Sequence, residues 1–173
     1  MSSPHPHPPR VRIQTEDFDL GAETLALRAA DGGVGAVVSF VGTVREASHG
    51  EALRLMELEH YPGMTEMAIE AMIDHAFDRF EIRGARVIHR VGPLAPREQI
   101  VLVLVSSAHR GQAFQACEFL MDYLKTQAPF WKKEYLPGGA RWVDARVADD
   151  AALARWGIVV DNAAEGAADG SGR

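Results

Sequence analysis

The sequence predicts an α+β fold, with a mixed, mainly antiparallel sheet and helices packed on it. Short apolar runs bounded by glycine, proline and polar residues are typical of strands, and between them lie longer stretches with apolar residues at helical spacing. Strands and helices follow one another irregularly rather than in repeated strand–helix units, which favours α+β over a purely parallel sheet. The 173 residues, 47% of them hydrophobic, suit one domain with a sizeable core.

The first half of this domain is expected to hold three strands and two helices. Strands are predicted at residues 11–14, 36–41 and 52–60, and helices at 20–30 and 64–80. The first helix is stopped by the run Asp31-Gly32-Gly33, and the second follows a Pro62-Gly63 turn. The second and third strands are expected to pair as a hairpin around a loop at 47–50.

The second half contains the longest predicted helix, at residues 110–126. It must end before Pro129, because a proline disfavours helical dihedrals in the residue that precedes it. Strands are predicted at residues 85–91, 99–106, 130–136 and 141–146. The first two of these are joined by a proline-rich turn at 92–96, and the last two by a hairpin loop at Pro137-Gly-Gly139.

Composition separates the domain from its ends and excludes several classes of function. Residues 1–9 and 161–173 are expected to be disordered tails around a single domain at 10–160. The net charge of −6 argues against nucleic acid as a partner, and no apolar run approaches the roughly 20 residues that span a membrane. The N-terminus lacks the apolar core of a secretory signal, so we expect a cytoplasmic protein.

The cysteine and histidine content gives no sign of a disulfide or a metal site. Cys117 is the single cysteine and lies on the apolar side of the long predicted helix, so a buried free thiol is expected. The histidines are scattered without the spacing of metal ligands, and no cofactor is expected.

The segment from Met121 to Glu134 is the first candidate site. Between Lys125 and Arg146 the chain holds five basic and two acidic residues, a local excess of positive charge in an acidic protein. Such an excess indicates a specific anionic ligand or an acidic partner. For Lys125 alone, a favourable interaction with the helix dipole at the C-terminal end explains the position equally well.

The second candidate site is the run Ser106-Ser107-Ala-His109-Arg110, where a predicted strand ends and the long helix begins. Free backbone N–H groups at a helix start favour an anion such as phosphate or carboxylate. Ser107 as a simple N-cap is an equally good interpretation of the motif. Arg110, however, is a cation at the positive end of a helix, which is easier to explain if an anion binds there.

The two candidate sites are too far apart to grip one small group within one chain. Arg110 and Lys125 are 15 residues apart on the predicted helix, which places them about 22 Å apart along its axis. Either the ligand is extended, or two chains pair so that the helix start of one approaches the helix end of the other. We expect a shared site in a homodimer.

Three motifs in this order resemble those of the large, catalytic subunit of molybdopterin synthase. They are Glu59-His-Tyr-Pro-Gly-Met64, Ser107-Ala-His-Arg110 and Met121-Asp-Tyr-Leu-Lys-Thr-Gln-Ala-Pro-Phe-Trp-Lys132. The resemblance runs from about Gly35 to Arg146 and implies an α/β-hammerhead type of fold. It also implies a sulfur transferase of molybdenum cofactor biosynthesis, which converts cyclic pyranopterin monophosphate (precursor Z) to molybdopterin by inserting two sulfurs.

The resemblance also implies the partners. In this family the sulfur donor is the C-terminal Gly-Gly thiocarboxylate of a small ubiquitin-like subunit, and two large subunits form the centre of a heterotetramer. A buried Cys117 agrees with a sulfur that arrives on the partner, because a persulfide carrier needs an accessible, activated thiol.

The family's site residues match seven positions of this chain. Lys125 and Lys132 match the catalytic residues, and the substrate-binding positions are matched by Arg45, His109, Arg110, Arg146 and Phe40. Lys125 is expected to shuttle a proton or to accept the partner's acyl carbon. For Phe40, ordinary core packing is the stronger interpretation of the sequence. The competing function is a non-catalytic adaptor whose basic, aromatic surface docks the partner's tail.

Overall fold

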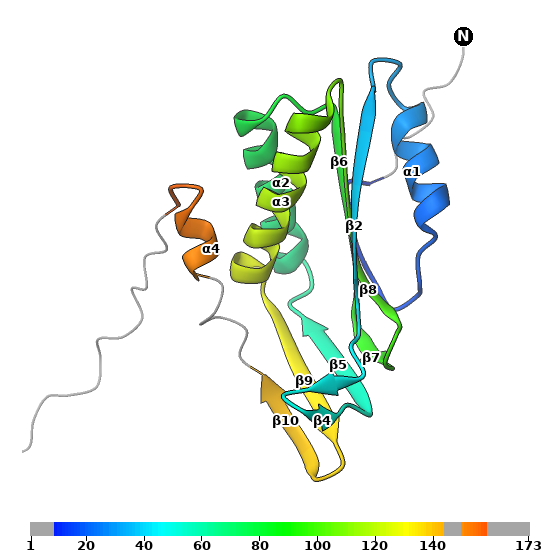
Figure 1. Cartoon of the computed structure of the whole chain (residues 1–173), viewed down its shortest axis with the longest axis vertical. Coiled ribbons are helices and arrows are strands. Elements are labelled where there is room, and N and C mark those ends of the chain that lie inside the picture. The colour runs from blue at the N-terminus through cyan, green and yellow to red at the C-terminus, as the bar shows by residue number, and fades with distance from the viewer. Residues whose placement is uncertain (1–8, 144–149, 159–173) are drawn as a thin grey trace, which may run out of the picture.

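The computed structural model describes residues 9–143 and 150–158. Figure 1 shows an elongated molecule with a sheet flanked by helices at one end and a second, smaller sheet at the other. The strands are joined mainly antiparallel and the helices pack on the sheet, which confirms the predicted α+β class.

The larger sheet has four strands in the order β1-β6-β8-β2. Their bounds are β1 (Val11–Gln14), β6 (Gly84–Arg90), β8 (Gln99–Ser107) and β2 (Ala36–Thr43). The β1–β6 pair is parallel, and the β6–β8 and β8–β2 pairs are antiparallel.

Helices cover both faces of this sheet. Helix α1 (Leu20–Ala29) lies on one face, and α2 (Met64–Arg79) and α3 (Arg110–Gln127) lie on the other (Figure 1). Side chains alternate between the faces along each strand. Val87 and Val103 therefore pack in the core with α2 and α3, whereas Ile88 and Leu102 pack in a smaller core with α1.

The ends of the helices follow from local sequence, as predicted. Helix α2 begins after Gly63, whose φ of 84° completes the Pro62-Gly63 turn and whose N–H donates to Glu66. Helix α3 ends at Gln127, and Ala128 is extended, as the residue before Pro129 must be. The chain then turns directly into the next strand.

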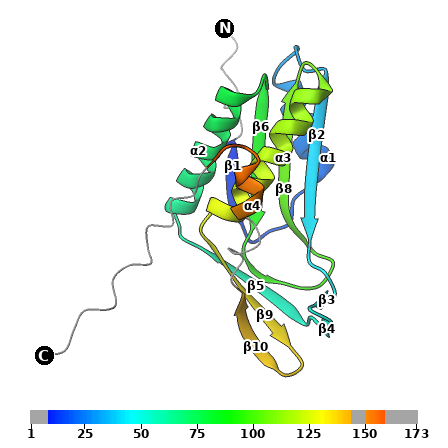
Figure 2. The same cartoon turned by 60° about the vertical axis from the view of Figure 1, so that its left-hand side comes forward.

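The smaller sheet has the order β10-β9-β5-β7, and all of its pairs are antiparallel. Its strands are β10 (Gly139–Val143), β9 (Phe130–Leu136), β5 (Leu55–His60) and β7 (Gly92–Leu94). Met56, Leu58 and Leu94 are buried in a small core of its own. Figure 2 shows the smaller sheet at the lower end of the larger one. The predicted β9–β10 hairpin is confirmed.

The predicted hairpin between the second and third strands is wrong. Strand β2 pairs with β8 along its length, and β5 belongs to the smaller sheet between β7 and β9. The segment between β2 and β5 folds on itself as a short hairpin of β3 (Ala47–Ser48) and β4 (Glu51–Ala52), where a loop was expected. Residues 92–94, expected within a turn, form β7.

Glycines allow the chain to leave the larger sheet after β2 and to turn between β3 and β4. His49 and Gly50, with φ of 50° and 83°, form the tight turn between β3 and β4. The β2–β8 register shifts between Gly42 and Thr43, and a Cβ on Gly42 would lie 2.8 Å from the Val101 side chain. The β-bulge re-aims the chain away from the larger sheet.

The C-terminal part of the described chain is tied to α3. Helix α4 (Asp150–Ala154) is followed by Trp156, whose ring packs edge-on against Phe80 and Phe119. The Trp156 indole N–H also donates to the Asp122 carboxylate at 2.7 Å. Residues 1–8 of the predicted N-terminal tail at 1–9, the predicted C-terminal tail at 161–173 and the strand residues 144–146 lie outside the described residues. Within the described chain, no helix is long and apolar enough to cross a membrane.

Candidate functional site

A cavity of about 810 Å³ opens where the two sheets meet the end of α3. Strands of both sheets line it together with the last turn of the helix. Four of the seven predicted site residues lie on its wall: Phe40, Arg45, Lys125 and Lys132. Residues far apart in the sequence therefore meet at one place.

Lys125 stands on the last turn of α3 and is exposed. Met121 and Leu124, which precede it by one helical turn and by one residue, also line the cavity. The Thr65 hydroxyl donates to the Pro129 carbonyl at 3.1 Å and so anchors the turn that follows. The position of the Lys125 backbone is thus fixed by the helix end, while its ammonium group is free to reach a ligand.

Lys132 faces the same cavity from β9. Alternation along the strand places Phe130 and Lys132 on the cavity side and Lys133 on the opposite side, where its ammonium lies 5.3 Å from the centre of the Tyr135 ring. The Lys132 ammonium lies 3.7 Å from a carboxylate oxygen of Glu134, two residues further along the strand.

Glu134 is a functional residue that the sequence analysis missed. Its side chain is 5% exposed, accepts a hydrogen bond from the Ser48 hydroxyl at 2.8 Å and pairs with Arg141 at 3.2 Å. Burial alone would raise the pKa of Glu134, but the hydrogen bonds from Ser48 and Arg141 and the charges of Lys132 and Arg141 outweigh it and lower the pKa. The ionised carboxylate thus holds the β3–β4 hairpin, β10 and Lys132 together.

Arg45 is exposed at the cavity edge just beyond β2. Its neighbour Val44 is 3% exposed and makes backbone hydrogen bonds to Glu98 and Arg97 at 2.9 and 2.8 Å. The arginine therefore extends from a fixed backbone toward the ligand space. Phe40, 37% exposed, lines the cavity instead of being enclosed in the core, which favours a ligand-facing role.

The floor of the cavity is aromatic. The ring of His89 stacks on that of Phe130 with centroids 3.9 Å apart and an interplanar angle of 19°. Burial lowers the pKa of His89 to about 4, so the imidazole is neutral at physiological pH. His60, next to this floor in the β5–β9 register, points its Nε2 toward Glu66 at 3.6 Å. The sequence carried no signal for His89, because it lies in a strand that also carries Arg86 and Arg90 and belongs to none of the motifs of the resemblance.

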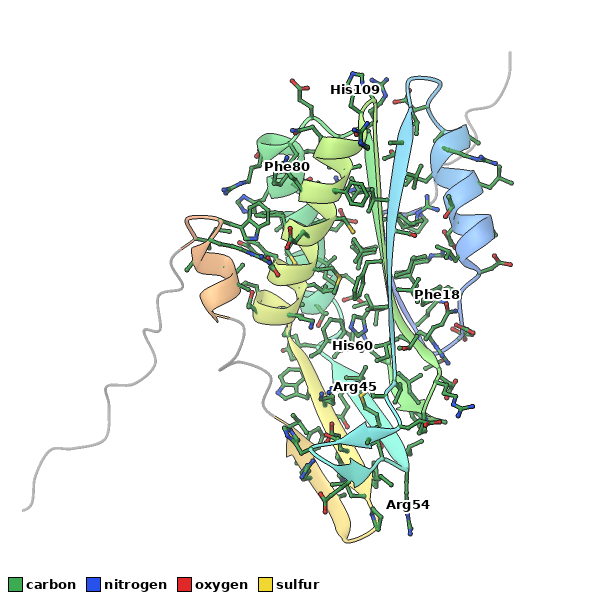
Figure 3. All side chains as sticks on the ribbon, in the orientation of Figure 1. Phe18, Arg45, Arg54, His60, Phe80 and His109 are labelled. Carbon is green, nitrogen blue, oxygen red and sulfur yellow. The ribbon has the colours of Figure 1, made fainter. Side chains whose placement is uncertain are left out.

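His109 and Arg110 do not line this cavity. They lie at the opposite end of α3, and Figure 3 shows His109 and Arg45 at distant places on the molecule. The N-cap of α3 is His109, and Ser107, the alternative N-cap, accepts a hydrogen bond from the His109 N–H at 3.1 Å. Arg110 and Lys125 are thus separated within one chain as the helix geometry predicted. Arg146 lies outside the described residues.

Neither a metal ion nor the cysteine thiol has a place in the chemistry that the described residues of this site offer. Among the described residues, no group of three His, Cys, Asp or Glu side chains is arranged to hold a metal ion. Cys117 is buried in the core against the larger sheet, and burial with the charge of Glu118 raises its pKa to about 11. A thiol held protonated in this way is a poor nucleophile.

The fold and the site define an α+β protein with a cation-rimmed, aromatic-floored cavity. Residues 13–127 match the family model described as MoaE protein. A molybdopterin synthase catalytic subunit from Ralstonia nicotianae is 63% identical over 155 residues, covering 90% of this chain and 88% of the relative. The chain belongs to the MoaE family and is an enzyme of the molybdopterin synthase catalytic-subunit type.

Solved structures share the fold. A molybdopterin biosynthesis MoaE protein from Burkholderia ambifaria matches with a TM-score of 0.76 and 57% identity, over 86% of this chain and 97% of that one. A protein–protein complex of subunits 1 and 2 of the molybdopterin-converting factor from Helicobacter pylori matches with a TM-score of 0.66, over 79% of this chain and 91% of that one. At 19% identity, the second match shows the fold alone.

Proposed function

We propose that this chain inserts two sulfurs into cyclic pyranopterin monophosphate to form the dithiolene of molybdopterin, with the C-terminal thiocarboxylate of a small ubiquitin-like subunit as donor. The observation that carries the proposal is the cavity shared by Lys125, Lys132 and Arg45. Three cationic side chains on one wall favour a ligand and a donor that both carry negative charge.

Lys125 is the residue that acts at the acyl carbon of the donor. In each transfer, a carbon–sulfur bond replaces a carbon–oxygen bond of the pterin substrate, whose oxygen leaves as water or on the phosphate, and the bond between sulfur and the tail's acyl carbon breaks. The acyl carbon passes to water or transiently to the Lys125 amine, and the tail is released as a carboxylate. Lys132 stabilises the negative charge that develops on the tetrahedral centre, and Glu134 keeps the Lys132 ammonium in place.

The donor tail suits the cavity because glycine has no side chain. A Gly-Gly terminus can enter a narrow space beside Met121 and Leu124, and its negative end can approach the two lysines. The solved Helicobacter pylori structure is a complex of subunits 1 and 2 of the molybdopterin-converting factor, in line with a small-subunit partner for this fold.

The substrate phosphate is held by His109 and Arg110 of a second copy of this chain, with help from Arg146. His109 and Arg110 are exposed at the start of α3, remote from the cavity of their own chain. A two-fold homodimer that brings the start of one α3 near the end of the other completes the site. Arg45 adds a bidentate contact at the cavity edge.

Reconstitution tests this function. Purified protein is mixed with cyclic pyranopterin monophosphate and a small partner whose C-terminus is either a thiocarboxylate or an ordinary carboxylate, and the dithiolene pterin is measured. We expect product with the thiocarboxylate only. A stable complex with the thiocarboxylated partner that makes no product would favour a docking role.

A further inference from the structure

His89 has a place in the cavity that the transfer chemistry does not use. It is the second-last residue of β6 and pairs with Val101 of β8. Strand alternation points its ring to the α2 and α3 side, where it lines the cavity with a residue exposure of 8%. A histidine in an otherwise apolar strand position costs free energy unless its polar atoms are used.

The ring is held in one orientation. One face stacks on Phe130, and Nδ1 lies 2.8 Å from the backbone carbonyl oxygen of Arg90. A carbonyl oxygen only accepts, so Nδ1 carries the hydrogen. The proton on Nδ1 fixes the tautomer, and the stacked ring cannot rotate without breaking both contacts.

The remaining nitrogen, Nε2, is therefore an acceptor. Burial lowers the pKa of His89 to about 4, with a smaller contribution from the charge of His60, so the ring stays neutral and Nε2 keeps its lone pair. Among the residues that the structure describes, Nε2 has no hydrogen-bond partner. Nε2 is not one of the fully buried, unpaired side-chain atoms of the described residues, so it is accessible from the cavity and a ligand donor can reach it.

The other polar side chains in and beside the cavity differ from His89 in kind. Lys132 and Arg45 are cations that only donate, and Lys125 is assigned to the donor's acyl carbon. The Glu134 carboxylate beside the cavity is already engaged by Ser48 and Arg141, and the Thr43 hydroxyl of the lining has no aromatic ring to hold a flat ligand. The cations select the anionic part of a ligand, but they cannot recognise N–H groups. His89 supplies a neutral acceptor beside a flat aromatic surface, which suits an N–H-bearing heterocycle.

We propose that His89 is a substrate-recognition residue whose Nε2 accepts a hydrogen bond from a ring or amino N–H of the bound pterin. This inference rests on the proposed function, because that function supplies a heterocycle with N–H donors. His89 acts in binding and takes no part in moving sulfur, so its loss acts on KM and the dissociation constant and leaves kcat in place.

Two variants separate the acceptor from the ring. His89→Phe keeps a ring that can stack on Phe130 and removes Nε2. His89→Gln removes the ring and places an amide oxygen near the position of Nε2. Binding of cyclic pyranopterin monophosphate is measured by titration calorimetry for both variants and the wild type, with melting temperatures and binding of the small partner as tests of folding.

We expect His89→Phe to weaken pterin binding about tenfold, the equivalent of one hydrogen bond, with kcat at saturating substrate within about twofold of wild type. His89→Gln should bind within about threefold of wild type. Equal binding by His89→Phe and wild type would overturn this inference alone, as would a loss confined to kcat or equal weakening in both folded variants. A wild type that binds no pterin would overturn the proposed function as well.

Discussion

The ammonium of Lys132 lies 3.7 Å from the buried carboxylate of Glu134, and the same carboxylate pairs with Arg141 and accepts a hydrogen bond from Ser48. One acidic side chain thus connects the cavity lysine to three structural segments: β9, β10 and the β3–β4 hairpin. The Lys132 ammonium and the contacts between these segments thus share one ionised carboxylate.

Replacing Glu134 by glutamine should lower the free energy of unfolding by about 1.5–3 kcal/mol, because hydrogen bonds to a charged group are lost while Arg141 stays in place. The lowered pKa adds a pH dependence. The contribution of Glu134 to the free energy of unfolding is complete above its ordinary pKa of 4.5. It is lost as the pH falls through the lower pKa that Glu134 has in the folded state. Denaturant unfolding below pH 4.5 should show this loss in wild type and not in Glu134→Gln. An equal pH dependence in both proteins would contradict the role of this carboxylate.

The buried ring of His89 should make the stability of the protein depend on pH in a second range. Its pKa falls from 6.5 in the unfolded chain to about 4 in the fold, so the unfolded state binds more protons between these values and stability drops as the pH is lowered through them. The loss should reach about 3 kcal/mol by pH 4. Denaturant unfolding of His89→Phe should lack this loss. A wild-type stability that stays constant from pH 6.5 to 4.5 would show that the ring is not buried neutral.

A shared dimer site predicts complementation between two defective variants. Lys125→Ala and Arg110→Ala each disable a different half of the site. In a heterodimer of the two, one site carries both substitutions and the other carries neither. Because random exchange makes half of the dimers heterodimers, the mixture should regain about a quarter of wild-type activity. Turnover is measured at low substrate after subunit exchange, with each variant alone as control. No recovery, despite exchange shown by a mass-tagged subunit, would place both residues in one chain's site.

Cys117 should be dispensable for sulfur transfer. Its thiol is buried, and burial raises its pKa to about 11, so it is neither accessible nor ionised. Cys117→Ala should keep kcat within about twofold of wild type and should lower stability by about 1 kcal/mol through lost packing. Product formation and thermal melting are the two measurements. A folded Cys117→Ala variant without activity would point to a protein-bound persulfide.

Local signals made much of the fold predictable. Pro129 determined where α3 ends, and Pro62-Gly63 determined where α2 begins. Strand partners were harder, because pairing depends on contacts distant in sequence. The pairing of β2 with β8 and the departure of β5 to a second sheet depend on the Gly42 bulge and on a two-residue turn at His49 and Gly50.

The candidate site was predictable where its residues belong to a distinctive motif. Lys125, Lys132 and Arg45 were predicted and meet at the cavity. His89 and Glu134 were missed because His89 lies in a strand with two arginines and outside any motif, and Glu134 looks like a solvated acid in a basic segment. Their roles come from burial and from partners more than 40 residues away, such as Phe130 for His89 and Ser48 for Glu134.

The most direct test of the proposed function compares Lys125→Arg with Lys133→Arg in the reconstituted reaction with thiocarboxylated partner and cyclic pyranopterin monophosphate. Arginine keeps the positive charge but cannot give up a proton or accept an acyl group near neutral pH. Lys133 is the matched control, because it is a lysine of β9 on the face away from the cavity. We predict that Lys125→Arg binds the partner and makes no dithiolene product, while Lys133→Arg turns over as wild type does. Near-normal product from Lys125→Arg would contradict a chemical role for Lys125 and leave it a docking residue.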